Sequence, residues 1–252
     1  MPRITKNAIE KLKNTLDIAD NFNNDLIRAI EQSIPKYTMK PNYKPSSLDC
    51  IRKMWFIMKS VNAESNESYQ SVGILQSGSD RHLRLQKIIC SNTFCKKIDI
   101  PKFIKDNKLN LQVKRLTEYE VNLYSPEYRV SFMLDGLIEY KDKIYILEIK
   151  TESNNKFYQH SKVREEHINQ ISTYSLLMKV PNILFIYENR DTLQLKSYLT
   201  TITNKQTEKI EKLIRSCDEY VEKDVIPPKS LIDSNVKCEY CNYISHCKGI
   251  KL

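Results

Sequence analysis

The stretch from Val130 to Thr151, VSFMLDGLIEYKDKIYILEIKT, decides the fold of this chain. Two runs rich in Ile, Leu, Tyr and Phe flank a short polar turn at residues 141–143, which is the pattern of a β-hairpin. Apolar residues occupy both faces of each run, as in strands that are covered on both sides. The sequence therefore predicts an α/β protein with this hairpin in the middle of its sheet.

Charged residues interrupt this apolar hairpin at Asp135, Glu148 and Lys150. Because side chains alternate along a strand, Glu148 and Lys150 project from the same face. A hairpin loop with an even number of residues places Asp135 on that face as well. An unpaired carboxylate in such apolar surroundings is costly, and Gly136 leaves room beside Asp135 for a close approach.

Two carboxylates and an ammonium at one point have a defined chemistry. Carboxylate oxygens are hard ligands that suit Mg²⁺ or Mn²⁺. A lysine beside them can hold an attacking water and offset charge on a phosphate. The set is equipment for metal-assisted phosphodiester hydrolysis, and the alternative interpretation is an exposed, charged strand end.

Composition narrows the classes of protein that remain. The 252 residues are 40% hydrophobic and 28% charged, which is enough for a packed core in one large domain or two small ones. The net charge of +9 favours a polyanionic partner, nucleic acid first and an anionic membrane second. The sequence has no membrane-spanning apolar run and no signal-peptide pattern, so we expect a cytoplasmic protein. With only four glycines and no glycine-rich phosphate motif, a Rossmann or P-loop nucleotide site is disfavoured.

Periodicity predicts the other elements. Along the chain, we expect helices before and after the strands. The first helix should break at Asn21–Asn24, and Ser46 or Ser47 should cap the second. The predicted helices are 4–32, one from residue 46, 78–89, 165–178 and 206–223; the predicted strands are 113–124, 129–151, 182–188 and 192–200; and the predicted loops are 35–45 and 61–72.

The charged hairpin resembles the core of the PD-(D/E)XK nucleases. The matching residues are Asp135-Gly136 and Glu148-Ile149-Lys150. The resemblance implies a restriction-endonuclease-like core, with a mixed central sheet flanked by helices. It also implies that Asp135, Glu148 and the Ile149 carbonyl hold Mg²⁺ or Mn²⁺ and that Lys150 positions the water.

Two further motifs are similar to those of the RecB-like branch of that family. Gly78–His82 (GSDRH) resembles its G-x-x-x-H motif, whose histidine helps to hold the metal, so His82 joins the predicted catalytic set. Gln170 and Tyr174 (QISTY) match Q-x-x-x-Y, which implies that they bind nucleic acid or buttress the active site. His167 is a candidate phosphate contact.

The cysteines indicate a second site. Seven cysteines without an export signal favour a metal or cluster site over a disulfide framework. Cys238 and Cys241 form a C-x-x-C pair that lets two thiolates bind one metal centre, and Cys247 supplies a third. The fourth ligand is either His246, which would complete a zinc knuckle, or Cys50 far upstream.

The upstream choice carries a resemblance of its own. Residues 47–56 (SLDCIRKMWF) resemble the segment before the core in iron–sulfur RecB-like nucleases, such as the AddB nuclease domain and CRISPR-associated RecB-like nucleases. There, one cysteine before the core and three after it hold a [4Fe–4S] cluster, which implies the ligands Cys50, Cys238, Cys241 and Cys247. We therefore expect a nuclease domain at 46–252 closed by the cysteine segment, and a helical extension at 1–45.

The resemblance implies a metal-dependent deoxyribonuclease, and specifically a single-strand-preferring exonuclease in DNA end processing, recombination or repair. Its partners would be DNA with free ends and a separate helicase, recombination or CRISPR protein, with no membrane. Two alternatives remain open. One is a non-catalytic DNA-binding module of the same fold with a structural iron–sulfur or zinc site, and the other is a zinc-stabilised interaction protein.

Overall fold

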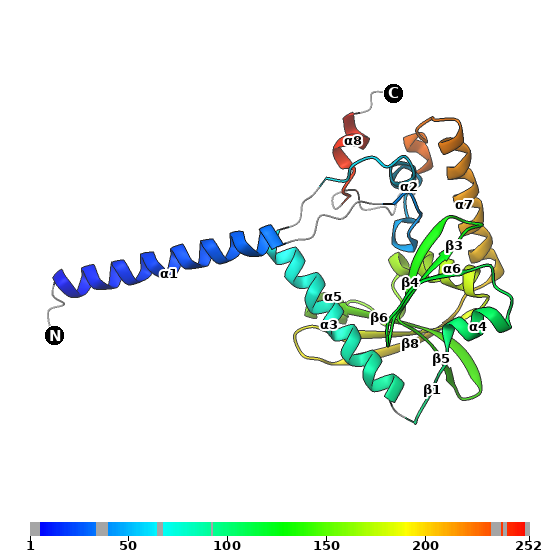
Figure 1. Ribbon diagram of the computed structural model, residues 1–252, viewed down its shortest axis with the longest axis horizontal. Coiled ribbons are helices and arrows are strands. Elements are labelled where there is room, and N and C mark those ends of the chain that lie inside the picture. Colours follow the sequence, from blue (N-terminus) through cyan, green and yellow to red (C-terminus); the bar gives the residue numbers. More distant parts are fainter. Residues whose placement is uncertain are drawn as a thin grey trace. The chain divides into compact units, whose positions relative to one another are not determined.

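The computed structural model describes residues 6–33, 40–64, 68–91, 93–232, 238 and 241–249 (Figure 1). Part of the predicted loop 35–45 and part of the predicted loop 61–72 fall outside these ranges. The chain divides into two compact units, one of residues 1–38 and 65–77, the other of residues 39–64 and 78–252. Within the described ranges, no helix is both long enough and apolar enough to cross a membrane.

The first unit contains α1 (Lys6–Ser33) and the beginning of α3 (Tyr69–Ser91). The predicted break at Asn21–Asn24 is wrong, because α1 continues through these residues as one helix. α3 begins within the predicted loop 61–72, before the predicted helix start at residue 78. The Ser68 hydroxyl accepts a hydrogen bond from the Ser71 backbone N–H and so caps the first turn of the helix.

The second unit is built on a mixed five-stranded sheet with the order β1-β5-β6-β7-β8. β6 and β7 are parallel, and every other neighbouring pair in this sheet is antiparallel. A separate three-stranded antiparallel sheet has the order β2-β3-β4. The strands are β1 (Lys96–Lys97), β2 (Gln112–Leu116), β3 (Val121–Ser125), β4 (Val130–Leu134), β5 (Gly136–Tyr140), β6 (Lys143–Glu152), β7 (Asn182–Asn189) and β8 (Leu195–Thr201).

Helices cover both faces of the five-stranded sheet. Alternation along β6 turns Leu147 and Ile149 to one face, where they pack with Leu85 and Ile89 of α3. Ile146 faces the opposite side and joins the main core, which includes the buried face of α6 (Glu165–Met178). This arrangement confirms the predicted mixed sheet flanked by helices and a restriction-endonuclease-like fold.

The decisive hairpin is formed by β5 and β6, with Gly136 paired to Leu147 and Tyr140 paired to Lys143. Its turn consists of Lys141 and Asp142, both at positive φ (49° and 59°), as a two-residue hairpin turn that follows the strand twist requires. The single predicted strand over 129–140 is wrong. Asp135 separates β4 from β5, and these two strands belong to different sheets.

Shorter helices complete the second unit. Cys50 caps α2 (Ile51–Met58), whereas the predicted caps Ser46 and Ser47 lie in the preceding 3-10 turn. That turn begins at a proline, which favours a tight turn over a helix start. The remaining elements are η1 (Pro45–Ser47), α4 (Ile100–Asp106), α5 (Asn154–Tyr158), α7 (Asn204–Glu222), η2 (Lys229–Leu231) and α8 (Ile244–Gly249).

Candidate active site and cysteine cavity

Strand β6 presents a lysine and a carboxylate side by side. Glu148 and Lys150 lie two residues apart on one face, and the Lys150 Nζ is 2.5 Å from a Glu148 carboxylate oxygen. Glu148 is 2% exposed, so its carboxylate is almost removed from water, whereas the Lys150 side chain is 24% exposed. A buried carboxylate of this kind is stable only with close partners.

Asp135 occupies the junction between the two sheets. The register of the hairpin, with Gly136 opposite Leu147, places Asp135 across from Glu148. One oxygen of the Asp135 carboxylate accepts a hydrogen bond of 2.7 Å from the Ile149 backbone N–H. The two-residue turn therefore sets the even loop length that brings both carboxylates to one place, as the sequence predicted.

Helix α3 approaches Asp135 with two side chains one turn apart. His82 Nδ1 lies 3.3 Å from the second oxygen of the Asp135 carboxylate, which brings the predicted histidine into the site. Gln86 donates from Nε2 to the Asp135 backbone carbonyl at 2.9 Å and is fully buried. Sequence reasoning missed Gln86. The signal that could have found it is its position four residues after His82 on the same helical face.

Gln170 of α6 connects the other half of the site. Its amide oxygen accepts a hydrogen bond of 3.2 Å from the Lys150 Nζ. Its Nε2 donates to the Glu148 carboxylate at 2.9 Å and to the Tyr174 hydroxyl at 2.7 Å. Gln170 and Tyr174 therefore buttress the lysine–carboxylate pair, which is one of the two roles predicted for them.

The electrostatics of the site follow from burial. Burial raises the pKa of Glu148 to about 7; Lys150 opposes the rise and the charge of Asp135 adds to it. Burial by itself lowers the pKa of His82, but the hydrogen bond and charge of Asp135 outweigh that effect, so the pKa is raised. The two acidic groups and the histidine are therefore electrically coupled.

His167 lies on the same side of β7 as the Lys150 network. Its Nδ1 is 2.8 Å from the Tyr187 hydroxyl, and its ring stacks on Phe185 and Tyr187. Burial, followed by the positive charge of Lys150, lowers the pKa of His167 to about 3, so the ring is neutral at neutral pH. His167 therefore packs against Tyr187 and Phe185 and hydrogen-bonds to Tyr187. Its predicted contact with a phosphate stays a prediction.

The donor set suits a divalent cation in kind. In the ranges that the structure describes, no three His, Cys, Asp or Glu side chains lie close enough together to hold a metal ion as they stand. The fit is therefore judged from the ligand types. Burial and the charge of Asp135 disfavour the ionised form of Glu148 and raise its pKa, and a bound cation would offset that free-energy cost. Carboxylate and carbonyl oxygens with one imidazole are ligands that Mg²⁺ and Mn²⁺ accept.

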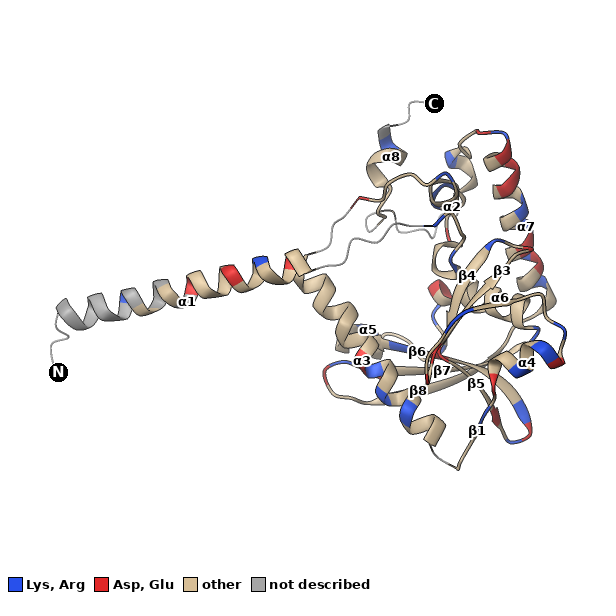
Figure 2. Cartoon of the chain, in the orientation of Figure 1, with Lys and Arg blue, Asp and Glu red and all other residues tan. Residues whose placement is uncertain are grey.

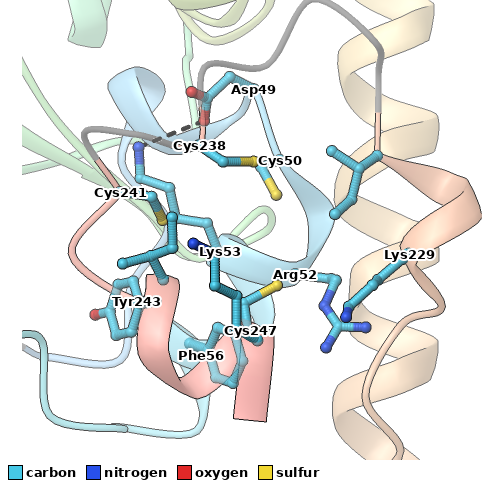
Figure 3. A pocket seen from close by; sticks show the side chains of 13 residues that line it. Asp49, Cys50, Arg52, Lys53, Phe56, Lys229, Cys238, Cys241, Tyr243 and Cys247 are labelled. Carbon is cyan, nitrogen blue, oxygen red and sulfur yellow. Dashed lines mark hydrogen bonds and ion pairs between the residues drawn. The ribbon is translucent and has the colours of Figure 1, made fainter. Parts of the chain in front are cut away.

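A second site is a cavity of about 360 Å³ between α2 and the C-terminal segment. Figure 3 shows four cysteines around it, which are Cys50, Cys238, Cys241 and Cys247. Burial raises the pKa of Cys50, and the neighbouring Cys241 thiol adds to the rise. The structure thus places the four predicted cysteine ligands around one cavity, while no three of these thiols, all within the described ranges, lie close enough together as they stand to hold a metal ion.

The wall of this cavity is positively charged. Four of its residues are basic, namely Arg52, Lys53, Lys229 and Lys248, against one acidic residue, Asp49. Arg52 is 1% exposed and donates from Nη1 to the Pro227 carbonyl at 2.8 Å, while its buried Nε and Nη2 have no hydrogen-bond partner in the described residues. Because these two donors are closed to solvent, they do not face the open cavity, and only the excess of basic residues around it bears on the charge of an occupant.

His246 does not line the cavity. Its Nε2 lies 3.0 Å from the Asn62 carbonyl, and its ring packs near Phe56 and Tyr243. Of the two candidates for a fourth ligand that the sequence left open, Cys50 lines the cavity and His246 does not. The other cysteines are elsewhere: Cys217 is buried near the Ile51 carbonyl, and Cys95 lies near the Ile89 carbonyl.

No protein-family model matches this chain, and no curated protein matches it. Among solved structures it is similar to the crystal structure of SSO0001, with 14% identity and a TM-score of 0.47 over 93% of this chain and 98% of that one. The alkaline exonuclease LHK-Exo from Laribacter hongkongensis matches with 12% identity and a TM-score of 0.47 over 74% and 90%. Its complex with dAMP matches with 12% identity and a TM-score of 0.48 over 73% and 89%. Likenesses this distant do not establish an activity for the chain.

Proposed function

We propose that this chain is a metal-dependent deoxyribonuclease of the PD-(D/E)XK type, in the RecB-like branch. The observation that carries the proposal is the ion pair of 2.5 Å between Lys150 and the buried carboxylate of Glu148. Gln170 holds both members of that pair, and the His82–Asp135 pair lies beside it. A surface strand end would show neither the burial nor these partners.

His82, the carboxylates of Asp135 and Glu148, and the Ile149 carbonyl would hold Mg²⁺ or Mn²⁺. When bound, the cation supplies Lewis acidity that offsets phosphate charge and favours ionisation of the attacking water. The Ile149 backbone N–H keeps one Asp135 oxygen in place, while His82 contacts the other. These contacts fix the orientation of the carboxylate before any substrate arrives.

Lys150 would act directly on the reacting groups. Its Nζ donates to the water and offsets the charge that develops on the phosphate as the water attacks. Gln170 accepts from the same Nζ at 3.2 Å, which limits the positions that the ammonium can adopt. Tyr174 in turn fixes the Gln170 amide through a hydrogen bond of 2.7 Å. Helix α6 therefore positions Lys150 through Tyr174 and Gln170.

The substrate class follows from charge and from the site. A net charge of +9 suits a polyanion, and a phosphodiester matches the acid, lysine and amide set. We infer that the chain cuts DNA from free ends and prefers single strands, in DNA end processing, recombination or repair. A separate helicase, recombination or CRISPR protein would deliver those ends.

We further propose that the cysteine cavity holds a [4Fe–4S] cluster through Cys50, Cys238, Cys241 and Cys247. A tetrathiolate cluster is anionic, so the excess of basic residues around the cavity supports it. Zinc bound by the same four thiolates is the alternative that metal analysis would separate. The role is structural, since the ligands join residue 50 to the end of the chain.

The nuclease is tested with anaerobically purified protein and end-labelled single- and double-stranded DNA, in Mg²⁺, Mn²⁺ or EDTA. The variant is Lys150→Ala, and its matched control is Lys143→Ala, at an exposed lysine of the same strand. We expect metal-dependent cutting that Lys150→Ala reduces by about 10³-fold or more, with DNA binding retained.

Unimpaired cutting by Lys150→Ala would overturn the catalytic assignment. Binding of DNA without cutting in any metal would instead indicate a non-catalytic module. The cluster has its own readout: iron and acid-labile sulfide in equal amounts in the parent protein, lost in Cys50→Ser and retained in Cys90→Ser. Zinc without iron in the parent would replace the cluster by a zinc site.

A further inference from the structure

Helix α1 exposes large apolar side chains in its second half. Phe22 and Leu26 are 68% and 47% exposed, respectively. A helix in water gains most of its stability by burying an apolar face, so 28 continuous helical residues with such exposure need a partner surface. Figure 2 shows both acidic and basic residues along the described part of α1, which is unlike the basic face of a membrane-surface helix.

The sequence of α1 contains a heptad pattern that specifies what covers this face. Apolar residues recur with the spacing of a coiled-coil seam over three and a half heptads, and such helices need roughly three to four. The seam positions are Ile9, Leu12, Leu16, Ala19, Asn23, Leu26 and Ile30. Isoleucine holds two of the four a positions (Ile9 and Ile30) and leucine two of the three d positions (Leu12 and Leu26), which is the combination that favours two parallel strands, while Leu16 and Ala19 depart from it.

Asn23 is the polar exception in this seam. In a parallel dimer in register, an asparagine at an a position faces the same asparagine of the second copy, and the two amides hydrogen-bond. In an antiparallel pair Asn23 would face a d residue, which cannot satisfy its amide. An asparagine that would be buried in the seam of a dimer therefore selects a second copy of this chain, in parallel orientation, as the partner that covers this face of α1.

The positions beside the seam agree with this register. In a parallel coiled coil, each g residue lies next to the e residue five positions later on the other helix. Phe22 and Ile27 stand in that relation, so each copy of α1 would place its phenylalanine against the isoleucine of the other. The other g positions (Ala8, Thr15 and Ala29) carry no charge, so no like charges face each other across the seam.

We propose that α1 pairs with α1 of a second copy as a parallel, in-register coiled coil, which makes the chain a homodimer. The interface is independent of the proposed nuclease activity, because the candidate active site belongs to the other compact unit. Each dimer carries two copies of that site.

The test measures the mass of the full chain in solution by light scattering during gel filtration. The parent should have twice the 29.7 kDa of one chain. Leu26→Asp, in the seam, should give single chains, whereas Ile18→Asp, at an exposed position outside the seam, should remain dimeric. Asn23→Ile should give particles larger than a dimer, because a polar residue at this position restricts the number of helices.

The register has a separate readout. Oxidation of Asn23→Cys by dissolved oxygen with a copper catalyst should join two chains through residue 23, above the level that the native cysteines give in the parent. A single-chain mass for the parent, a dimeric Leu26→Asp, or equal dissociation by Ile18→Asp would overturn the proposal. So would the absence of the additional cross-link at residue 23, since the parallel register brings these positions together.

Discussion

The candidate active site and the cysteine cavity are held together in opposite ways. At the active site, Gln170 bonds both Lys150 and Glu148, and Ile149 bonds Asp135, so its walls contact one another. At the cavity, four cysteines and four basic residues surround open space. The residues of the first site bond one another, whereas the second is the site for which we propose an occupant.

The largest effect should come from removing charge at the assembled site. Glu148→Gln keeps the shape of the side chain but removes a carboxylate, so we expect cutting to fall by about 10³-fold or more, or about 4 kcal/mol. The matched control is Glu139→Gln on the neighbouring strand, where the carboxylate pairs with Lys96 at the surface. Turnover of labelled DNA at saturating Mn²⁺ measures the difference.

The same substitution should stabilise the fold. The folded pKa of Glu148 is raised to about 7, so the folded chain binds more protons than the unfolded chain below that value, and stability falls as pH rises through this window. Above pH 7, Glu148→Gln should therefore raise the free energy of unfolding by about 1–3 kcal/mol in EDTA. Urea unfolding measures it, and a loss of stability would mean that the pair with Lys150 outweighs burial.

The cavity should respond in the other direction. Cys50→Ser removes a predicted ligand, so the occupant and the stability it contributes should both be lost, by at least about 3 kcal/mol or roughly 6–12 °C in melting temperature. Cys90→Ser is the control because it does not line the cavity. Equal melting temperatures for the two variants would show that the cavity stabilises the fold without an occupant.

Acid should distinguish the two regions next. His167 is neutral in the folded chain down to a pKa of about 3, against an ordinary value of 6.5, because burial disfavours its charged form. The unfolded chain takes up the proton first, so this contribution to stability is complete above pH 6.5 and is lost as pH falls toward 3. Near pH 5 the parent should therefore have lost about 2 kcal/mol relative to His167→Gln, because the opposite pH dependence of Glu148 is present in both proteins and cancels in the difference.

The control for this pH dependence is His246→Gln, at an exposed histidine near the cavity. Urea unfolding of the three proteins at neutral and acid pH gives the comparison. If the parent and His167→Gln lost stability equally on acidification, another group would carry the acid sensitivity.

Much of the site was readable from sequence because it depends on short spacings. The alternation of Glu148 and Lys150 and the helical turn from Gln170 to Tyr174 follow from the periods of a strand and a helix. The passage of the chain from one sheet to another at Asp135 was not readable, because a single residue separates β4 from β5 and the pattern fits one continuous strand. The bond from Gln86 to the Asp135 carbonyl depends on how α3 packs against the sheet, which no local pattern encodes.

The smallest predicted effect concerns Gln86, a residue beside the candidate active site whose side-chain amide is only partly hydrogen-bonded. Gln86 donates to the Asp135 carbonyl, but its own buried amide oxygen has no partner in the described residues. Gln86→Leu removes that unpaired oxygen and the support of Asp135 together, so the two effects on folding oppose each other. Stability should therefore change by less than about 1 kcal/mol, while the Mn²⁺ concentration needed for half-maximal cutting rises about tenfold.

Gln76→Leu, at an exposed glutamine of α3, controls for the helix itself. A drop in cutting that saturating Mn²⁺ does not restore would show that Gln86 maintains the packing of α3, and that Asp135 is held by Ile149 and His82 alone.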